Sequence, residues 1–200
     1  MKAIICTRPS TPGDLILADL PDPVPETGEV VVRIAATALN FFDLLIIAGT
    51  YQYKPAYPFS PGAEFAGTVE SLGPGVTEFA VGDRVLGYPG WGAAREKLAI
   101  AANKLVKLPA NLDFDRAAGL CVTYGTSYHA LKDRAHLVAG ETLAVLGASG
   151  GVGLAAIELG KLMGARVIAC ASTEEKLSFA REHGAAHGIN YATEIGRAHV

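Results

Sequence analysis

The sequence predicts an α/β protein in which a domain of short strands precedes a doubly wound parallel sheet. Three observations support this fold class. Residues 1 to about 110 form a series of short apolar runs separated by turns, and from about residue 112 strand-like and helix-like segments alternate. A glycine-rich turn joins one of these later strands to the next helix. The alternation is typical of parallel sheets, whose neighbouring strands need a crossover connection.

The first part of the chain resembles an irregular β-barrel or sandwich, because its expected strands are short and regularly spaced. Val30, Val32, Ile34 and Ala36 alternate along one of them and are expected on one face. A proline-rich connection at 20–25 cannot be regular structure. The expected strands are Met1–Thr7, Glu29–Ala38, Phe65–Leu72, Arg84–Tyr88, Arg95–Ile100 and Leu105–Leu108.

The second part begins with two expected helices, at 113–119 and 126–134, and the domain boundary is expected between about 110 and 125. Thr173 is a predicted helix N-cap, and Gly184 is the predicted residue just after the same helix. The alternating elements are expected at Thr142–Gly147 (strand), Val152–Met163 (helix), Arg166–Ala171 (strand), Thr173–His183 (helix) and Gly188–Tyr191 (strand).

The glycine-rich turn reads Ala148-x-Gly150-x-x-Gly153, a G-x-G-x-x-G pattern with alanine in its first position. It follows an apolar strand and opens a helix, which is the context that a bound pyrophosphate requires. Glycines let the backbone approach the phosphates, and the helix N-terminus offers free N–H groups. We therefore expect a dinucleotide site here; the alternative is a purely structural strand-to-helix turn.

The end of the next expected strand, 166–171, distinguishes between the two nicotinamide cofactors. An acidic residue there would bind the ribose hydroxyls and repel a 2′-phosphate. The chain instead continues with Ser172 and Thr173, and Lys176 follows one helical turn later. Glu174 and Glu175 argue against a phosphate, but acids are favoured in a first helical turn for capping reasons. NADPH is favoured over NADH.

Composition excludes several functional classes. The 200 residues carry a net charge of −3, and the 17 basic residues are scattered, which disfavours a nucleic-acid or anionic-membrane surface. The chain has no apolar run of the length that spans a membrane. Its three cysteines are far apart, so a disulfide framework is not expected and a cytoplasmic location fits.

The motifs together resemble the medium-chain dehydrogenase/reductase superfamily, and within it the zinc-free quinone oxidoreductases. The resemblance implies a GroES-like catalytic domain at 1–120 and the first half of an NADP-binding Rossmann domain at 121–193. It also implies a homodimeric full-length parent. The matching motifs are Ala38–Asp43, Gly49–Tyr51, Pro61–Gly67, Val81–Val85, Val122–Thr126, the glycine turn and Gly188–Tyr191.

The resemblance also bears on metal chemistry and on the reaction. Zinc-dependent relatives place a cysteine near position 39–41 and a histidine beside the first-domain glutamate. This chain has Asn40 in the first place and Ala63 before Glu64 in the second, so no metal is expected. Without zinc to polarise a carbonyl, hydride addition to a quinone or conjugated enone is the expected reaction. The alternatives are an enoyl-thioester or alkenal reductase of the same superfamily and a non-catalytic NADPH-binding or structural protein.

The resemblance assigns Asn40 and Tyr51 as catalytic hydrogen-bond donors, with Asn40 also facing the cofactor. Asn40 as a cap of a helix at 41–48, and Tyr51 as a packing residue, remain the alternative interpretations. Glu64 is interpreted as a buried structural acid and is not assigned a catalytic role. The expected cofactor-binding residues are Asn40, Thr126, Gly150, Gly151, Val152, Gly153, Ser172, Lys176 and Tyr191.

The C-terminal end of the sequence departs from this family pattern. The resemblance implies about three more strand–helix units after Tyr191. The last seven residues, 194–200, match the read-through of a common sequencing adapter, and we expect them to be a non-native tail on a shortened reading frame. A divergent natural terminus is the alternative.

Overall fold

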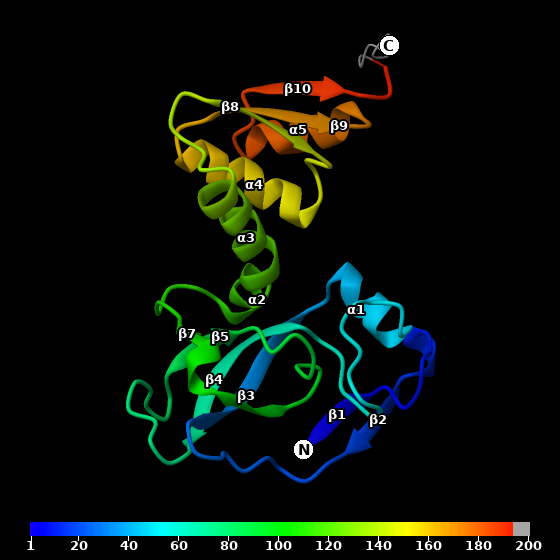
Figure 1. Ribbon diagram of the computed structural model, residues 1–200, viewed down its shortest axis with the longest axis vertical. Helices are drawn as coiled ribbons and strands as arrows, with labels where there is room; N and C mark the ends of the chain where they lie inside the picture. Colours follow the sequence, from blue (N-terminus) through cyan, green and yellow to red (C-terminus); the bar gives the residue numbers. More distant parts are fainter. Residues whose placement is uncertain (194–200) are drawn as a thin grey trace. The chain divides into compact units, whose positions relative to one another are not determined.

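The structure is a computed structural model, and it describes residues 1–193; the expected non-native tail at 194–200 lies outside the described residues. The chain divides into two compact units, Met1–Cys121 (unit 1) and the residues from Val122 onward (unit 2). Figure 1 labels most of their helices and strands. A strand-rich antiparallel unit therefore precedes a unit with a parallel sheet, and the predicted α/β fold class is confirmed.

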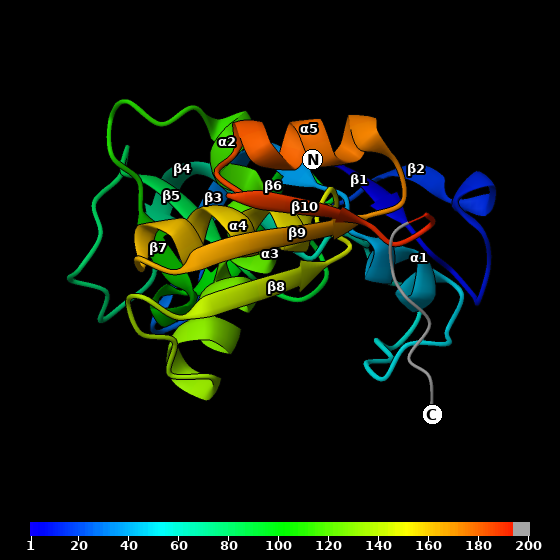
Figure 2. The same ribbon diagram turned by 90° about the horizontal axis from the view of Figure 1, so that it is seen from above.

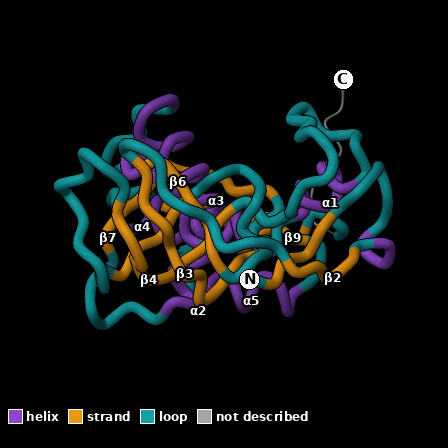
Figure 3. Tube along the Cα trace, turned by 90° about the horizontal axis from the view of Figure 1, so that it is seen from below, coloured by secondary structure: helices purple, strands orange, loops and turns teal. Residues whose placement is uncertain are grey.

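Unit 1 is built on a five-stranded antiparallel sheet in the order β6-β3-β4-β5-β7. Its connections are mostly loops, drawn in teal in Figure 3. Val30, Val32, Phe65 and Val85 are fully buried in its largest core cluster, which accounts for the alternating apolar pattern along β3. The strands are β3 (Glu29–Ala38), β4 (Glu64–Leu72), β5 (Arg84–Gly87), β6 (Lys97–Ala101) and β7 (Leu105–Lys107).

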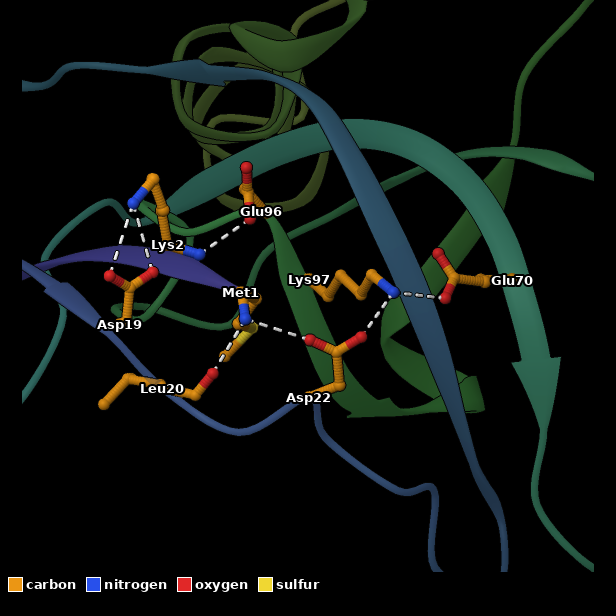
Figure 4. A network of polar contacts seen from close by, with 8 residues as sticks. All are labelled: Met1, Lys2, Asp19, Leu20, Asp22, Glu70, Glu96 and Lys97. Atoms are coloured by element: carbon orange, nitrogen blue, oxygen red, sulfur yellow. Dashed lines mark hydrogen bonds and ion pairs between the residues drawn. The ribbon is translucent and has the colours of Figure 1, made fainter.

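A smaller sheet pairs β1 (Lys2–Ile5) with β2 (Ile16–Asp19), an antiparallel strand that the sequence pattern did not predict. Three of its four residues are exposed, so β2 lacks the apolar alternation that identifies a half-buried strand. Ion pairs join this part of the chain to the large sheet (Figure 4): Lys97 Nζ lies 2.6 Å from both Asp22 Oδ2 and Glu70 Oε1. A 3-10 turn, η1 (Pro12–Asp14), lies between β1 and β2.

Two short helices complete unit 1, together with a 3-10 turn, η2 (Ala102–Lys104). Helix α1 (Phe41–Ile47) begins immediately after Asn40, its N-cap residue. Helix α2 (Phe114–Ala118) packs Ala117 and Ala118 against Ala66 and Leu86 of the sheet. The predicted helix at 113–119 is thereby confirmed to within a residue at each end.

Unit 2 contains a three-stranded parallel sheet in the order β10-β9-β8 (Figure 2). Helices α4 and α5 connect successive strands and cover one face, where Val145, Ile157, Val167 and Leu177 form the core. Thr173 caps α5 through its side-chain oxygen and Gly184 follows at φ +119°, as predicted. The elements are β8 (Thr142–Leu146), α4 (Gly151–Leu162), β9 (Arg166–Ala171), α5 (Glu174–Glu182) and β10 (His187–Asn190).

One predicted helix has the wrong bounds. In place of a helix at 126–134, α3 spans Leu120–Tyr128 and a π-helical segment, η3, spans His129–Arg134. Apolar and polar residues do not separate onto two faces in 120–125, so periodicity did not reveal the first turns. Within residues 1–193, the structure has no helix both long and apolar enough to cross a membrane.

Candidate functional site

The glycine turn of unit 2 has the geometry of a phosphate-binding loop. β8 ends at Leu146, Gly147 takes φ +63°, and Gly150 is the N-cap of α4. A Cβ on Gly153 would lie 2.3 Å from the Gly147 carbonyl oxygen, so only glycine permits this close packing. The first N–H groups of α4 have no carbonyl of their own helix to bond and remain available for an anion.

Five of the expected cofactor-binding residues line one cavity of about 550 Å³ in unit 2. The cavity also runs along Leu143–Leu146, the outer edge of β8. Its wall includes Ser127, whose buried hydroxyl donates to the Val152 carbonyl at 2.8 Å and so fixes α3 against the start of α4. The five predicted residues in this wall are Thr126, Gly150, Gly151, Val152 and Gly153.

The end of β9 carries a second polar group. Lys176 Nζ donates to Ser172 Oγ at 3.3 Å, and the Lys176 backbone N–H donates to Thr173 Oγ1 at 3.3 Å. Glu174 pairs with Arg181 within α5, which compensates one of the two acids that argued against a phosphate. The other acid, Glu175, lines a cavity of about 600 Å³ together with Lys176, and Ser149 of the glycine turn also lines it.

Tyr191, the last expected cofactor residue, follows β10. Its backbone N–H donates to the Ala171 carbonyl at 3.1 Å, so it stands beside the residue that precedes Ser172. Its side chain is 44% exposed. The parallel register of β9 and β10 therefore brings Ser172, Lys176 and Tyr191 to the same carboxyl edge of the sheet.

Asn40 lies in unit 1, at the junction of β3 and α1. Asn40 and Asp43 form a capping box, in which the Asn40 backbone N–H donates to Asp43 Oδ2 at 2.8 Å. The Asn40 amide nitrogen Nδ2 donates to Glu64 Oε1 at 3.0 Å. Asn40 thus caps the helix, as the alternative interpretation held, and also holds a fully buried carboxylate. It lines a largely apolar cavity of about 390 Å³.

Tyr51, the other expected catalytic residue, is half-buried against α1. Its ring stacks on Phe42 at a centroid distance of 5.4 Å and meets the edge of Tyr53 at 5.7 Å. Within the described residues the Tyr51 hydroxyl makes no hydrogen bond. Its position thus combines the packing that the alternative interpretation expected with a hydroxyl that is free to donate.

Two residues near Asn40 were not in the predicted site, and strand register locates both. Ala38 pairs with Glu64 across β3 and β4, and Phe65 pairs with Gly87 across β4 and β5. Tyr88 therefore follows β5 at the end of the sheet where Glu64 begins β4. Burial, and then the neighbouring tyrosines and carboxylates, raise the pKa of the Tyr88 phenol. The signal in the sequence was Glu64, an acid between Gly62 and Gly67 immediately before a predicted strand. Its pairing with Ala38 of β3 was needed to place it beside Asn40.

Comparison with known proteins agrees with both units. A family model described as "Alcohol dehydrogenase GroES-like domain" matches residues 26–110, and one described as "Zinc-binding dehydrogenase" matches residues 151–199. A quinone oxidoreductase of Lama guanicoe is 38% identical over 197 residues, which are 98% of this chain and 60% of that protein. The chain belongs to the quinone oxidoreductase family of medium-chain dehydrogenases/reductases.

Other family members support the same alignment. A quinone oxidoreductase-like protein 2 homolog of Nematostella vectensis is 42% identical over 170 residues, 84% of this chain and 46% of that protein. The quinone oxidoreductase of Thermus thermophilus, whose structures include a complex with NADPH, superposes with a TM-score of 0.84 at 38% identity. That match covers 94% of this chain and 59% of the other. The chain thus spans about half the length of the curated relatives.

The residues of this chain at the positions where zinc-dependent relatives bind their metal determine whether zinc could bind here. One matching family model is named for zinc, but Asn40 and Ala63 stand where zinc-dependent relatives have soft or imidazole ligands. Residues 1–193 contain no group of three or more His, Cys, Asp or Glu side chains arranged to share a metal ion. The residues at these positions do not fit a catalytic zinc.

Proposed function

We propose that this protein is a zinc-independent oxidoreductase that transfers a hydride from NADPH to a quinone or a conjugated enone. One observation carries the choice of cofactor: the end of β9 has no acid and presents the hydrogen-bonded pair Ser172 and Lys176. A 2′-phosphate suits this pair, since the ammonium supplies charge and the hydroxyl supplies a donor. NADPH complexes are reported for relatives, including the Thermus thermophilus enzyme.

In this proposal the glycine turn and the N-terminus of α4 hold the pyrophosphate, and Ser172, Lys176 and Tyr191 hold the adenosine 2′-phosphate. The tight packing of Gly153 against Gly147 favours this fit, because a side chain at 153 would collide with the backbone of the turn and displace it. When bound, NADPH supplies the hydride, and the protein contributes orientation and electrostatics. Residues 1–120 are the proposed catalytic domain, and residues 121–193 are the proposed first half of the NADP-binding domain.

At the acceptor, the proposed work of the chain is to stabilise negative charge on an oxygen. Hydride addition to a quinone or enone places charge on oxygen, which hydrogen-bond donors stabilise and water then protonates. Asn40 and Tyr51 are the proposed donors, and the apolar cavity that Asn40 lines, about 390 Å³, is of the size that holds a small ring. No Lewis acid is needed for such an acceptor.

The test measures NADPH oxidation by its change in absorbance. The acceptors 1,4-benzoquinone, 9,10-phenanthrenequinone, an enone and crotonyl-CoA are assayed in parallel. We expect turnover with the quinones or the enone and no dependence on added zinc. Preference for crotonyl-CoA would favour the enoyl-thioester alternative, and binding of NADPH without turnover would favour a non-catalytic binder. The assay is run on the 200-residue chain and on a full-length family member that carries the same residues.

The choice of cofactor has its own variant. Lys176→Ala should reduce the preference for NADPH over NADH about tenfold, the value of one charge-assisted hydrogen bond. Lys132→Ala, an exposed lysine on η3, is the matched control and should leave the preference unchanged. Equal affinity of the parent for the two cofactors would contradict the proposed 2′-phosphate site.

A homodimer is the proposed assembly of the full-length protein, and light scattering would measure it.

A further inference from the structure

Glu64 was interpreted from the sequence as a structural acid, but its position suggests a more specific role. Its side chain is fully buried, and its Oε1 accepts a hydrogen bond of 3.0 Å from Asn40 Nδ2. We propose that Glu64 is a positioning residue that fixes the Asn40 carboxamide, leaving one amide hydrogen as the donor to substrate oxygen. This inference rests on the proposed function, because Asn40 is the proposed donor.

The backbone explains why these two residues meet although they are 24 positions apart. Glu64 is the first residue of β4 and pairs with Ala38, the last residue of β3. A register shift between Ile34 and Ala36 sets this pairing, since a bulge changes which residues face each other downstream. Asn40 follows Ala38 by two positions and begins α1, so its side chain is delivered to the buried carboxylate.

The chemistry of the two groups determines which way round the amide lies. The NH2 group of Asn40, not its carbonyl, faces Glu64, since an amide nitrogen can only donate and Glu64 Oε1 accepts from it. The capping box with Asp43 uses the backbone N–H of Asn40 and does not engage its Nδ2. One of the two Nδ2 hydrogens is used by Glu64, and the second remains. Glu64 therefore selects the donor face of the amide over the acceptor face.

The surroundings make this selection matter energetically. Glu64 has no exposed surface, so an Asn40 amide turned the other way would place its carbonyl oxygen against a buried carboxylate. Asn40 itself is only partly buried and borders the apolar cavity, so its remaining hydrogen can reach a ligand. A buried acceptor behind a partly exposed amide is an arrangement that orients a donor before substrate arrives.

Turnover tests the functional part of the inference. Glu64→Leu should lower kcat at least tenfold with little change in the KM for quinone, because the donor acts on charge that develops in the transition state. Glu64→Gln keeps an acceptor and should stay within about threefold of the parent. In an Asn40→Ala background, Glu64→Leu should cost less than about twofold more, since the two act as a unit. Glu78→Leu, on an exposed loop, is the matched control.

Nuclear magnetic resonance tests the geometry without any requirement for activity. In the ¹⁵N-labelled 200-residue chain, the two Asn40 Nδ2 protons should differ, one exchanging slowly with water and the other fast. Glu64→Leu should make them exchange alike, and Glu78→Leu should not. Equal exchange of the two protons in the parent, or additive losses in kcat from the double variant, would overturn the inference. An inactive parent with unequal protons would instead refute the proposed function and leave the positioning intact.

Discussion

Gly153→Ala tests the glycine turn most directly. The structure shows which atoms the new side chain would meet, and Gly150 in the same turn offers a control variant. The new Cβ would lie 2.3 Å from the Gly147 carbonyl oxygen and 3.0 Å from Ala148 Cα, both backbone atoms. Such an overlap requires the turn to move, at a cost of about 3 kcal/mol for overpacking. Alanine in a helix gains about 1 kcal/mol over glycine, so we expect a net loss of about 2 kcal/mol.

Gly150→Ala is the matched control within the same turn. Its Cβ would meet only the Gly147 oxygen, at 3.4 Å, and its φ of −81° suits alanine. Because Gly150 is the N-cap of α4, where alanine is poorer than glycine, we expect a cost of about 1 kcal/mol at most, half that of Gly153→Ala. For a unit of this size, 2 kcal/mol corresponds to a drop in Tm of about 10 °C.

The assay is a thermal melt by circular dichroism, with hydrogen exchange and mass spectrometry assigning the loss to β8 and α4. If the proposed cofactor site is correct, Gly153→Ala should also weaken stabilisation by added NADPH, because moving the turn displaces the N–H groups proposed to hold the pyrophosphate. A Gly153→Ala variant that melts at the same temperature as Gly150→Ala, and that NADPH stabilises as much as the parent, would refute the reasoning.

Three further predictions concern other parts of the molecule. Burial, and then the charge of Glu64, raise the pKa of the Cys121 thiol to about 11, so it stays protonated at neutral pH. Iodoacetamide should therefore alkylate Cys121 about 100-fold more slowly at pH 8 than it alkylates a free cysteine. The rate should rise about tenfold per pH unit toward pH 11. A rate that levels off near pH 9 would contradict this. Leu146 is 75% exposed on β8, whose outer edge is unpaired within residues 1–193. An unpaired edge can pair with a second chain, so Leu146→Lys should reduce self-association in sedimentation experiments. An unchanged association constant would show that this edge is not the contact between chains. The Arg84 guanidinium donates to three loop carbonyls at 2.6 to 3.2 Å and lies 4.4 Å above the Phe114 ring. Arg84→Lys should therefore lower the free energy of unfolding in urea by about 2 kcal/mol. A loss under about 0.5 kcal/mol would show that a lysine ammonium replaces the guanidinium.

Local sequence patterns were sufficient for much of the fold. Alternation of apolar residues predicted β3 with its observed bounds, Glu29–Ala38, because one face of a half-buried strand must be apolar. Thr173 and Gly184 marked the ends of α5 because capping depends on residues within one turn. β2 and the first turns of α3 were missed, since their residues carry no periodic separation of apolar and polar side chains.

The same division holds for the candidate site. The sequence by itself identified the glycine turn and the acid-free end of β9, since both are contiguous and act through their own backbone or near neighbours. Only the tertiary structure paired Asn40 with Glu64 and gathered five predicted cofactor residues around one cavity in unit 2. Contacts between distant residues depend on strand order and on bulges that shift the register, and a one-residue shift would turn Glu64 to the other face of the sheet.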